Sequence, residues 1–140
     1  MRQMTALIKP ASSACNLKCS YCFYCDEAAS REKKSNTFMT NDTAKNLISK
    51  MFDFCGENSV LTFMFQGGEP LLAGVDFFKD FIETAENFKT NGSIINYSLQ
   101  TNGTLINEEY CKLFKKHNFL IGVSVDGNKE LHDKNRSASF

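Results

Sequence analysis

The stretch VLTFMFQGGEP, residues 60–70, joins a run of mostly apolar residues to a turn sequence. VLTFMF is rich in β-branched and aromatic residues, which is typical of a buried strand. The QGGEP segment that follows brings two glycines and a proline together, so the strand is expected to end there. The stretch therefore predicts a buried strand with an unusual turn at its carboxyl end.

Strand and helix patterns alternate on both sides of this strand. Residues 5–10, TALIKP, read as a short strand ended by Pro10. Between Thr40, a helix-capping residue type, and Gly56, apolar side chains recur at helical spacing. Downstream, the patterns predict a helix at 78–88, a strand at 94–100, a helix after Asn107 and a strand at 119–125. This alternation implies an α/β fold with a parallel sheet and right-handed crossovers.

Unusual sequences directly follow each predicted strand. Cysteines follow the first strand, GGEP the second and TNGT (101–104) the third, while Ser124 and Asp126 lie at the end of the fourth. The carboxyl ends of parallel strands meet at one edge of the sheet, where ligands bind in such folds. These segments are therefore expected to form one site.

The composition argues against some classes of partner. The chain has 140 residues with 16 Lys plus Arg and 16 Asp plus Glu, so neither a nucleic-acid nor an anionic-membrane partner is expected. No stretch is long and apolar enough to span a bilayer, and residues 1–13 lack the apolar core of a signal peptide. A cytoplasmic protein is expected, in which reducing conditions keep thiols free.

Four of the six cysteines lie within residues 14–25, ACNLKCSYCFYC. Cys15, Cys19 and Cys22 have the spacing C-x3-C-x2-C, which lets one loop place three thiolates around a small inorganic centre. A cubane iron–sulfur cluster normally takes four cysteines, so three leave one iron open for a small molecule. A zinc site is the alternative, although the distant second ligand pair of structural zinc sites is missing. Cys25 is interpreted as a spare thiol.

Several polar residues at the strand ends have a structural interpretation beside a functional one. They either line the predicted pocket or serve turn chemistry: Gln66, Gln100, Thr101 and Asn102. Asp126 likewise belongs either to a turn with Gly127 or to the ligand site.

Residues away from the strand ends are expected to be structural. Cys55 and Cys111 fall on predicted helices, where cysteines act as small core residues. His117 and His132 are interpreted as surface or helix-end residues. The charged residues 27–34 are expected to form a solvated loop.

The cysteine spacing with an aromatic residue before the last cysteine, followed by GGEP after the second strand, resembles the signature of radical S-adenosylmethionine (SAM) enzymes. The segments LIKPASSACNLKCSYCFY, FQGGEPLLAG, SLQTNGTLI and GVSVDGNKELHDKNR are similar to those of the anaerobic sulfatase-maturating enzymes, from about residue 6 to Arg136. The implied fold is a parallel βα-repeat sheet, the first four βα units of a partial TIM-like barrel. Residues 1–140 are expected to form the N-terminal portion of that radical SAM core.

The resemblance also assigns roles to residues. Cys15, Cys19 and Cys22 would bind a 4Fe-4S cluster whose open iron takes the amino and carboxylate groups of SAM. The backbone of Tyr21 would contact the SAM adenine, and the backbone of Gly68 would contact the SAM amino group. Further cofactor contacts are expected from Gly67, Glu69, Pro70, Ser124 and Arg136, the last through the SAM carboxylate. A carboxylate such as that of Glu69 either fixes an ammonium or orients the loop.

The function implied by the resemblance is that of a radical SAM oxidoreductase. One electron from the cluster would cleave SAM to methionine and a 5′-deoxyadenosyl radical, which oxidises a Cys or Ser of a sulfatase to Cα-formylglycine. A sulfatase or another peptide would be the substrate, with a flavodoxin- or ferredoxin-type protein as electron donor. Two alternatives are another radical SAM peptide-modifying enzyme, such as a thioether maturase, and a non-catalytic metal-binding module.

The sequence departs from the family in two ways. The radical SAM core usually has six βα units, whereas four strands are predicted here. The maturases also carry a further region with auxiliary clusters and a proton acceptor, so the catalytic acid is not expected among these residues. The 140-residue chain is therefore expected to be an N-terminal part that does not form formylglycine alone.

Overall fold

The computed structural model describes residues 1–24, Ser30 and residues 37–138. Cys25 and, apart from Ser30, the charged segment 27–34 lie outside the described residues. The elements in chain order are β1 (Gln3–Ile8), β2 (Leu17–Cys19), α2 (Asn41–Cys55), β3 (Val60–Phe65), a 3-10 helix η1 (Pro70–Ala73), α3 (Val75–Phe88), β4 (Ile94–Thr101), α4 (Glu108–Lys116), β5 (Leu120–Val123), α5 (Lys129–Asn135) and β6 (Arg136–Ala138).

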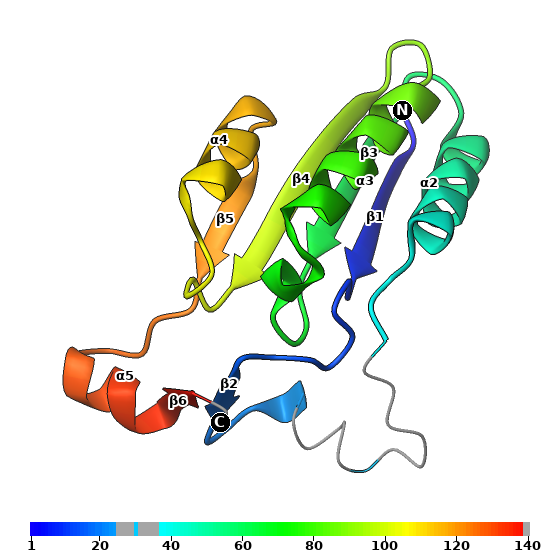
Figure 1. Cartoon of the computed structure of the whole chain (residues 1–140). Coiled ribbons are helices and arrows are strands. Elements are labelled where there is room, and N and C mark those ends of the chain that lie inside the picture. Colours follow the sequence, from blue (N-terminus) through cyan, green and yellow to red (C-terminus); the bar gives the residue numbers. More distant parts are fainter. Residues whose placement is uncertain (25–29, 31–36, 139–140) are drawn as a thin grey trace.

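Four strands form a parallel sheet in the order β1-β3-β4-β5, as the alternation predicts. The register aligns Ile8 with Phe65 and Phe65 with Leu99, so the strands end at a common edge. Helices α2, α3 and α4 lie along the sheet, and the strands point toward a smaller unit formed by β2, α5 and β6 (Figure 1).

Capping residues fix the helix boundaries where the sequence predicts them. Thr40 accepts a hydrogen bond from the Thr43 N–H at the start of α2, and Gly56 ends that helix with a φ of 69°. Asn107 caps α4 by accepting from the Tyr110 N–H over 3.0 Å. These local hydrogen bonds set where the helices begin relative to the strands.

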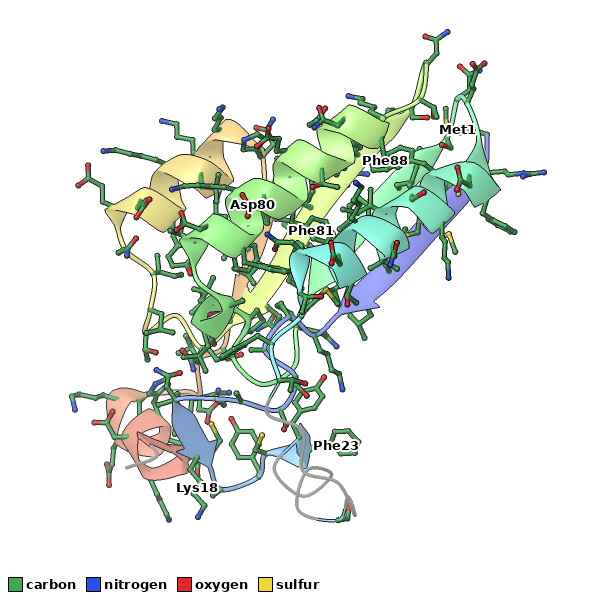
Figure 2. The ribbon with its side chains drawn as sticks, turned by 45° about the vertical axis from the view of Figure 1, so that its right-hand side comes forward. Met1, Lys18, Phe23, Asp80, Phe81 and Phe88 are labelled. Carbon is green, nitrogen blue, oxygen red and sulfur yellow. The ribbon has the colours of Figure 1, made fainter. Side chains whose placement is uncertain are left out.

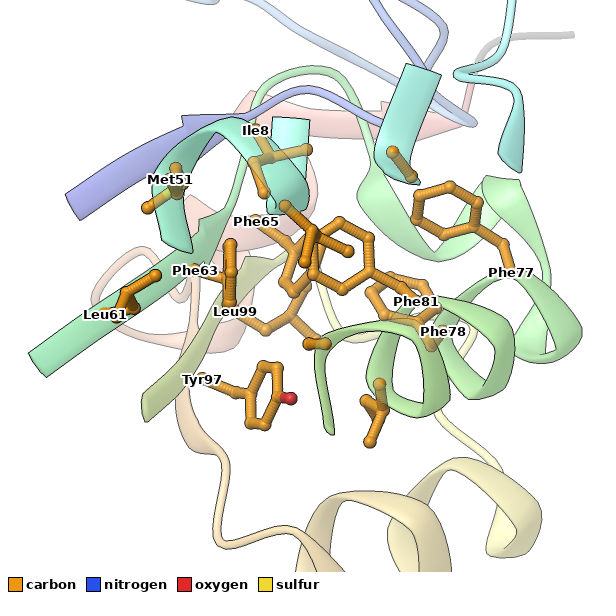
Figure 3. Close-up of a cluster of buried hydrophobic side chains, with 14 of the residues drawn as sticks. Ile8, Met51, Leu61, Phe63, Phe65, Phe77, Phe78, Phe81, Tyr97 and Leu99 are labelled. Carbon is orange, nitrogen blue, oxygen red and sulfur yellow. The ribbon is translucent and has the colours of Figure 1, made fainter. Parts of the chain in front are cut away.

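The core lies between the sheet and its helices. Alternate residues of β3, namely Leu61, Phe63 and Phe65, are buried, whereas Met64 is 37% exposed. The predicted buried strand is therefore confirmed for the face that packs against the helices, whereas Met64 on the opposite face is partly exposed. The rings of Phe63 and Phe81 lie 5.0 Å apart in an edge-to-face arrangement, and Figure 3 shows these aromatic side chains pointing toward one another.

Two cysteines outside the loop differ from each other. Cys55 is buried in the core, as predicted. Cys111 is exposed, so its prediction as a core residue is wrong. Helix α4 turns Tyr110 and Phe114 toward the core, and the 100° step between consecutive residues directs the side chain after Tyr110 to solvent.

A second, two-stranded sheet is not predicted from the sequence. Strand β2 pairs antiparallel with β6, with Leu17 opposite Ala138 and Cys19 opposite Arg136. Each strand is too short to show an alternating pattern. The pair joins the cysteine loop to a segment more than a hundred residues later. Figure 2 labels Lys18 of β2 and Phe23, which lies in the segment after β2, at this end of the molecule. Among the described residues, none of the helices is long and apolar enough to cross a membrane.

Candidate functional site

A cavity of about 160 Å³ opens at the carboxyl ends of the parallel strands. The four segments that follow the strands contribute to its wall, as the sequence predicts. The lining residues are Cys15, Leu17, Cys19, Cys22, Tyr24, Gln66, Gly67, Gly68, Gln100, Thr101, Asn102, Ser124 and Arg136. Of the predicted cofactor contacts, Tyr21, Glu69 and Pro70 are outside this lining, and Glu69 and Pro70 are buried behind it.

The three thiols share this cavity in partly shielded positions. Burial raises the pKa of Cys15, while hydrogen bonds from the Leu17 N–H and the Asn102 amide act in the opposite direction. Burial also raises the pKa of Cys19, whereas the positive charge of the nearby Arg136 guanidinium acts to lower it. A metal that binds Cys15 and Cys19 would displace the protons of these thiols.

The cysteine loop suits a soft metal centre by its chemistry. Three sulfur donors facing one cavity are the ligands that iron–sulfur clusters and zinc take. Within the described residues, no group of three or more His, Cys, Asp or Glu side chains is arranged so that it could hold a metal ion. The loop nevertheless brings its three thiols to the wall of the same cavity.

The two glycines of GGEP pack against the segment that follows β1: Gly67 faces the Lys9 side chain and Gly68 faces the start of the cysteine loop. Gly67 and Gly68 have φ values of 86° and 57°, a backbone region that other residues rarely adopt. A Cβ atom on Gly68 would overlap the carbonyl oxygen of Ala14, directly before Cys15. The missing side chains thus let the turn after β3 approach the start of the cysteine loop.

Glu69 is a fully buried carboxylate that ties three segments together. Its Oε1 accepts from Thr101 Oγ1 over 2.7 Å and from the Leu71 N–H over 3.0 Å, and its Oε2 accepts from the Asn102 N–H over 2.8 Å. These hydrogen bonds orient the loop, which is one of the two roles that the sequence left open for this carboxylate.

Tyr21, Asp126 and Arg136 form a second polar group beside the cavity. Arg136 Nη2 lies 2.9 Å from Asp126 Oδ1, and the Tyr21 hydroxyl donates to Asp126 Oδ2 over 2.6 Å. These two donors hold the pKa of the Asp126 carboxyl below its usual value. Asp126 thus does more than form a turn, because it joins the cysteine loop to the segment after β5.

Ser124 is held by a glutamine from the neighbouring strand. Gln100 Nε2 donates to Ser124 Oγ over 2.9 Å. A Cβ atom on Gly122 would overlap Gln100 Oε1, so the glycine in β5 leaves room for this side chain. The polar residues at the ends of β3 and β4 line the cavity. Two of them also serve the turn, because Thr101 Oγ1 accepts from the Gly103 N–H over 3.1 Å and Asn102 Oδ1 accepts from the Thr104 N–H over 3.0 Å.

Sequence reasoning missed the partners of these residues. Asn16 and Thr104 hydrogen-bond to each other and to Asn102, and the side chain of Tyr21 pairs with Asp126. The only local signal was position, since Asn16 lies inside the cysteine stretch and Thr104 in the turn after β4.

His117 caps the end of α4 and His132 lies in α5, in agreement with their predicted helix-end positions.

Comparisons with known proteins agree with this geometry. A sequence profile of the Radical SAM superfamily matches residues 10–140. The chain is 48% identical over 136 residues to the cysteine-type anaerobic sulfatase-maturating enzyme of Clostridium novyi (strain NT), covering 97% of this chain and 36% of that protein. It is 38% identical over 130 residues to the serine-type anaerobic sulfatase-maturating enzyme of Klebsiella pneumoniae, covering 93% and 32%.

Solved structures share the fold. Native anSMEcpe with bound AdoMet, which is SAM, superposes with a TM-score of 0.85 at 41% identity, over 96% of this chain and 35% of that one. Native anSMEcpe with bound AdoMet and Cp18Cys peptide superposes with a TM-score of 0.85 at 40% identity, over 99% and 35%. The chain therefore spans about a third of the length of these relatives.

The predicted α/β fold is confirmed by these superpositions and by the parallel order of the strands. The superfamily profile begins just before the cysteine loop and runs through β6. It therefore contains all four strand-end segments that surround the cavity. On this evidence the protein belongs to the radical SAM superfamily.

Proposed function

We propose that residues 1–140 belong to the core domain of a radical SAM oxidoreductase of the sulfatase-maturating type. The observation that carries the proposal is the single cavity on which three cysteine thiols, the Gly67–Gly68 turn, Ser124 and Arg136 converge. A zinc-binding module would need only the thiols as metal ligands. The other three groups form a polar wall beside them, which suits a ligand bound next to a metal centre.

Cys15, Cys19 and Cys22 would hold a 4Fe-4S cluster, and the cavity beside them would hold SAM. When bound, the cluster would supply the electron for reductive cleavage of SAM and so the radical chemistry that removes a hydrogen atom from the substrate. Three thiolates, rather than four, leave one coordination position for the SAM amino and carboxylate groups.

The residues around the thiols would bind and orient SAM. The backbone of Gly68, on the wall of the cavity, would contact the SAM amino group, while Ser124, fixed by Gln100, would contact the polar end of SAM. Arg136 lies 3.9 Å from Cys19 Sγ through Nη1, so its guanidinium reaches the metal side of the cavity and suits the SAM carboxylate. Tyr21 would offer its backbone to the adenine, because its hydroxyl is engaged by Asp126.

The substrate would be a sulfatase peptide in which a cysteine is oxidised to Cα-formylglycine. Greater identity to the cysteine-type relative, 48% against 38% for a serine-type one, favours cysteine over serine. A small flavodoxin- or ferredoxin-type protein would supply the electron. We place the reaction in the cytoplasm, where reducing conditions keep the thiols available for iron.

Anaerobic reconstitution with iron and sulfide, followed by EPR with and without SAM, tests the proposal. We expect the spectrum of the reduced cluster to change when SAM is added. Cys22→Ser should prevent normal cluster assembly, whereas Cys111→Ser, which replaces an exposed cysteine, should leave it intact. Bound zinc without a cluster would contradict the proposal and favour the metal-binding module.

Two product assays separate the enzymatic alternatives. Release of 5′-deoxyadenosine from SAM distinguishes an enzyme from a protein that only carries a cluster. Mass spectrometry of a cysteine-containing sulfatase peptide distinguishes formylglycine from a thioether crosslink, which would indicate the other class of peptide-modifying enzyme. Residues 1–140 alone are not expected to form formylglycine, so its detection with them would contradict that expectation.

A further inference from the structure

Asn102 lies between the buried Glu69 carboxylate and the first of the three cysteines. It directly follows β4, and its backbone N–H donates to Glu69 Oε2 over 2.8 Å. Its side-chain Nδ2 lies 3.8 Å from Cys15 Sγ, within hydrogen-bonding distance of a sulfur acceptor. The residue is therefore anchored to the rigid sheet while its amide points at a proposed iron ligand.

The neighbours of Asn102 fix the orientation of its amide. Oδ1 accepts from the Thr104 backbone N–H over 3.0 Å, and a backbone N–H can only donate. The oxygen thus faces Thr104, which leaves Nδ2 facing Cys15 and Asn16 Oδ1, the latter over 2.9 Å. Because the amide has two N–H groups, one serves Asn16 and the other serves the sulfur.

A closed ring of side-chain hydrogen bonds holds this amide in place. Asn16 Nδ2 donates to Thr104 Oγ1 over 2.8 Å, and the Thr104 hydroxyl donates to Asn102 Oδ1 over 2.8 Å. The Asn102 amide closes the ring by donating to Asn16. Each of the three side chains both donates and accepts, and such satisfied networks keep their members rigid.

We propose that Asn102 is a positioning residue that raises the reduction potential of the cluster through its hydrogen bond to Cys15. The inference rests on the proposed cluster at these cysteines. An N–H donor at a ligand sulfur stabilises the additional negative charge of the reduced state, so reduction becomes easier. Asn102 would act on the electron uptake that the proposed function needs through Cys15, the proposed iron ligand that its amide faces.

Redox titration of the reconstituted chain, followed by EPR, tests this inference with three variants. Asn102→Leu has a similar volume and no donor, and Asn102→Asp keeps an oxygen toward Thr104 but has no N–H. Thr104→Val is the matched control, because it opens the same ring without touching a sulfur. At a fixed ambient potential, the ratio of reduced to oxidised cluster should fall about five- to tenfold in both Asn102 variants. It should change by less than about twofold in Thr104→Val.

Pulsed ENDOR in H2O and D2O gives a second measurement. The exchangeable proton of the Asn102 amide should couple to the reduced cluster in the wild type and in Thr104→Val. The coupling should be missing in Asn102→Leu.

The outcomes separate this inference from the function on which it rests. The inference is overturned if the reduction potential is unchanged in both Asn102 variants, or if Thr104→Val shifts it equally. The proposed function still holds in these cases if the cluster responds to SAM. Loss of iron in both Asn102 variants but not in Thr104→Val also overturns it, because Asn102 would then only hold Cys15 in place. A wild-type chain without a 4Fe-4S cluster overturns the proposed function and this inference together.

Discussion

Gly68 shows why single residues at the strand ends cannot be exchanged freely. Its φ is 57°, and the space where a side chain would begin is taken by the Ala14 carbonyl oxygen. Gly56 also has a positive φ, 69°, but nothing lies within 4 Å of a Cβ placed there. A side chain at Gly56 would therefore cause backbone strain alone, whereas one at Gly68 would cause both strain and a clash with the neighbouring loop.

We expect Gly68→Ala to lower the free energy of unfolding by about 3 kcal/mol or more, because strain and overlap add. Gly56→Ala should cost only about 1 kcal/mol, the strain alone. Urea denaturation of both variants measures the difference. Equal costs would mean that the Gly68 turn moves away from Ala14 without penalty.

Glu69 stabilises the site as a charged acceptor. Replacement by Gln keeps the shape but turns one oxygen into a donor, which then faces an N–H or O–H group that also donates. Glu69→Gln should lower the free energy of unfolding by about 2 kcal/mol, since hydrogen bonds to charged groups contribute about 1.5–3 kcal/mol. Glu57→Gln, at an exposed position, is the control and should change stability by less than about 0.5 kcal/mol.

At the scale of elements, two buried tyrosines use their hydroxyls differently. Tyr110 on α4 donates to the Leu71 carbonyl over 2.8 Å and so joins α4 to η1. Tyr97 on β4 has a buried hydroxyl without a hydrogen-bond partner among the described residues. A buried polar group without a partner lowers the stability of the fold. The Tyr110 hydroxyl should therefore stabilise the folded state, whereas the Tyr97 hydroxyl should destabilise it.

Tyr110→Phe should therefore lower the free energy of unfolding by about 1 kcal/mol. The loss is limited because the Leu71 carbonyl still accepts from the Gly74 N–H over 3.1 Å. Tyr97→Phe should leave stability unchanged or raise it by up to about 1 kcal/mol. Chemical denaturation of the two variants side by side measures both effects, and a large loss in Tyr97→Phe would reveal a partner for its hydroxyl.

Stability should also fall at alkaline pH. Burial raises the pKa of Tyr110 to about 12 from its ordinary value of 10.0. Because the folded pKa lies above the unfolded one, the contribution of Tyr110 is complete below pH 10 and is lost as the pH rises toward 12. Denaturation between pH 9 and about pH 11 should show a steeper loss in the wild type than in Tyr110→Phe. Parallel curves would show that Tyr110 ionises equally in both states.

At the scale of the whole molecule, the sheet with its helices carries a smaller antiparallel unit at its ligand edge (Figure 1). Asp126 fastens that unit, because it pairs with Arg136 of β6 and accepts from Tyr21 beside β2. Both side chains of the ion pair are largely shielded, with 13% and 14% of their surface exposed. The pair therefore contributes more than a solvent-exposed one.

Asp126→Asn should loosen this smaller unit without unfolding the sheet. We expect amide hydrogen exchange in β2 and β6 to accelerate about tenfold, with little change in β3 and β4. Asp133→Asn is the control, since it removes the exposed ion pair with Lys129 in the same region. Uniform acceleration across all strands would show instead that the small unit and the sheet open together.

The order of the elements and the place of the site could be predicted from the sequence alone. Periodicity predicted the parallel strands, and caps such as Thr40 and Asn107 set helix ends through contacts three residues away. Because parallel strands end at one edge, the cysteines, glycines and Ser124 had to converge there. These predictions succeeded because they depend on neighbours along the chain and on the geometry of parallel sheets.

Which side chains meet within that site depends on the packing of distant segments and could not be predicted from the sequence. Asn102 and Asn16 are 86 positions apart in the sequence, and Arg136 and Cys19 are 117 apart. The burial of Glu69 and the exposure of Cys111 likewise depend on how loops and helices pack on the sheet. Local patterns carry no information on such contacts, because each of these polar side chains has equally good partners in water until the fold brings distant segments together.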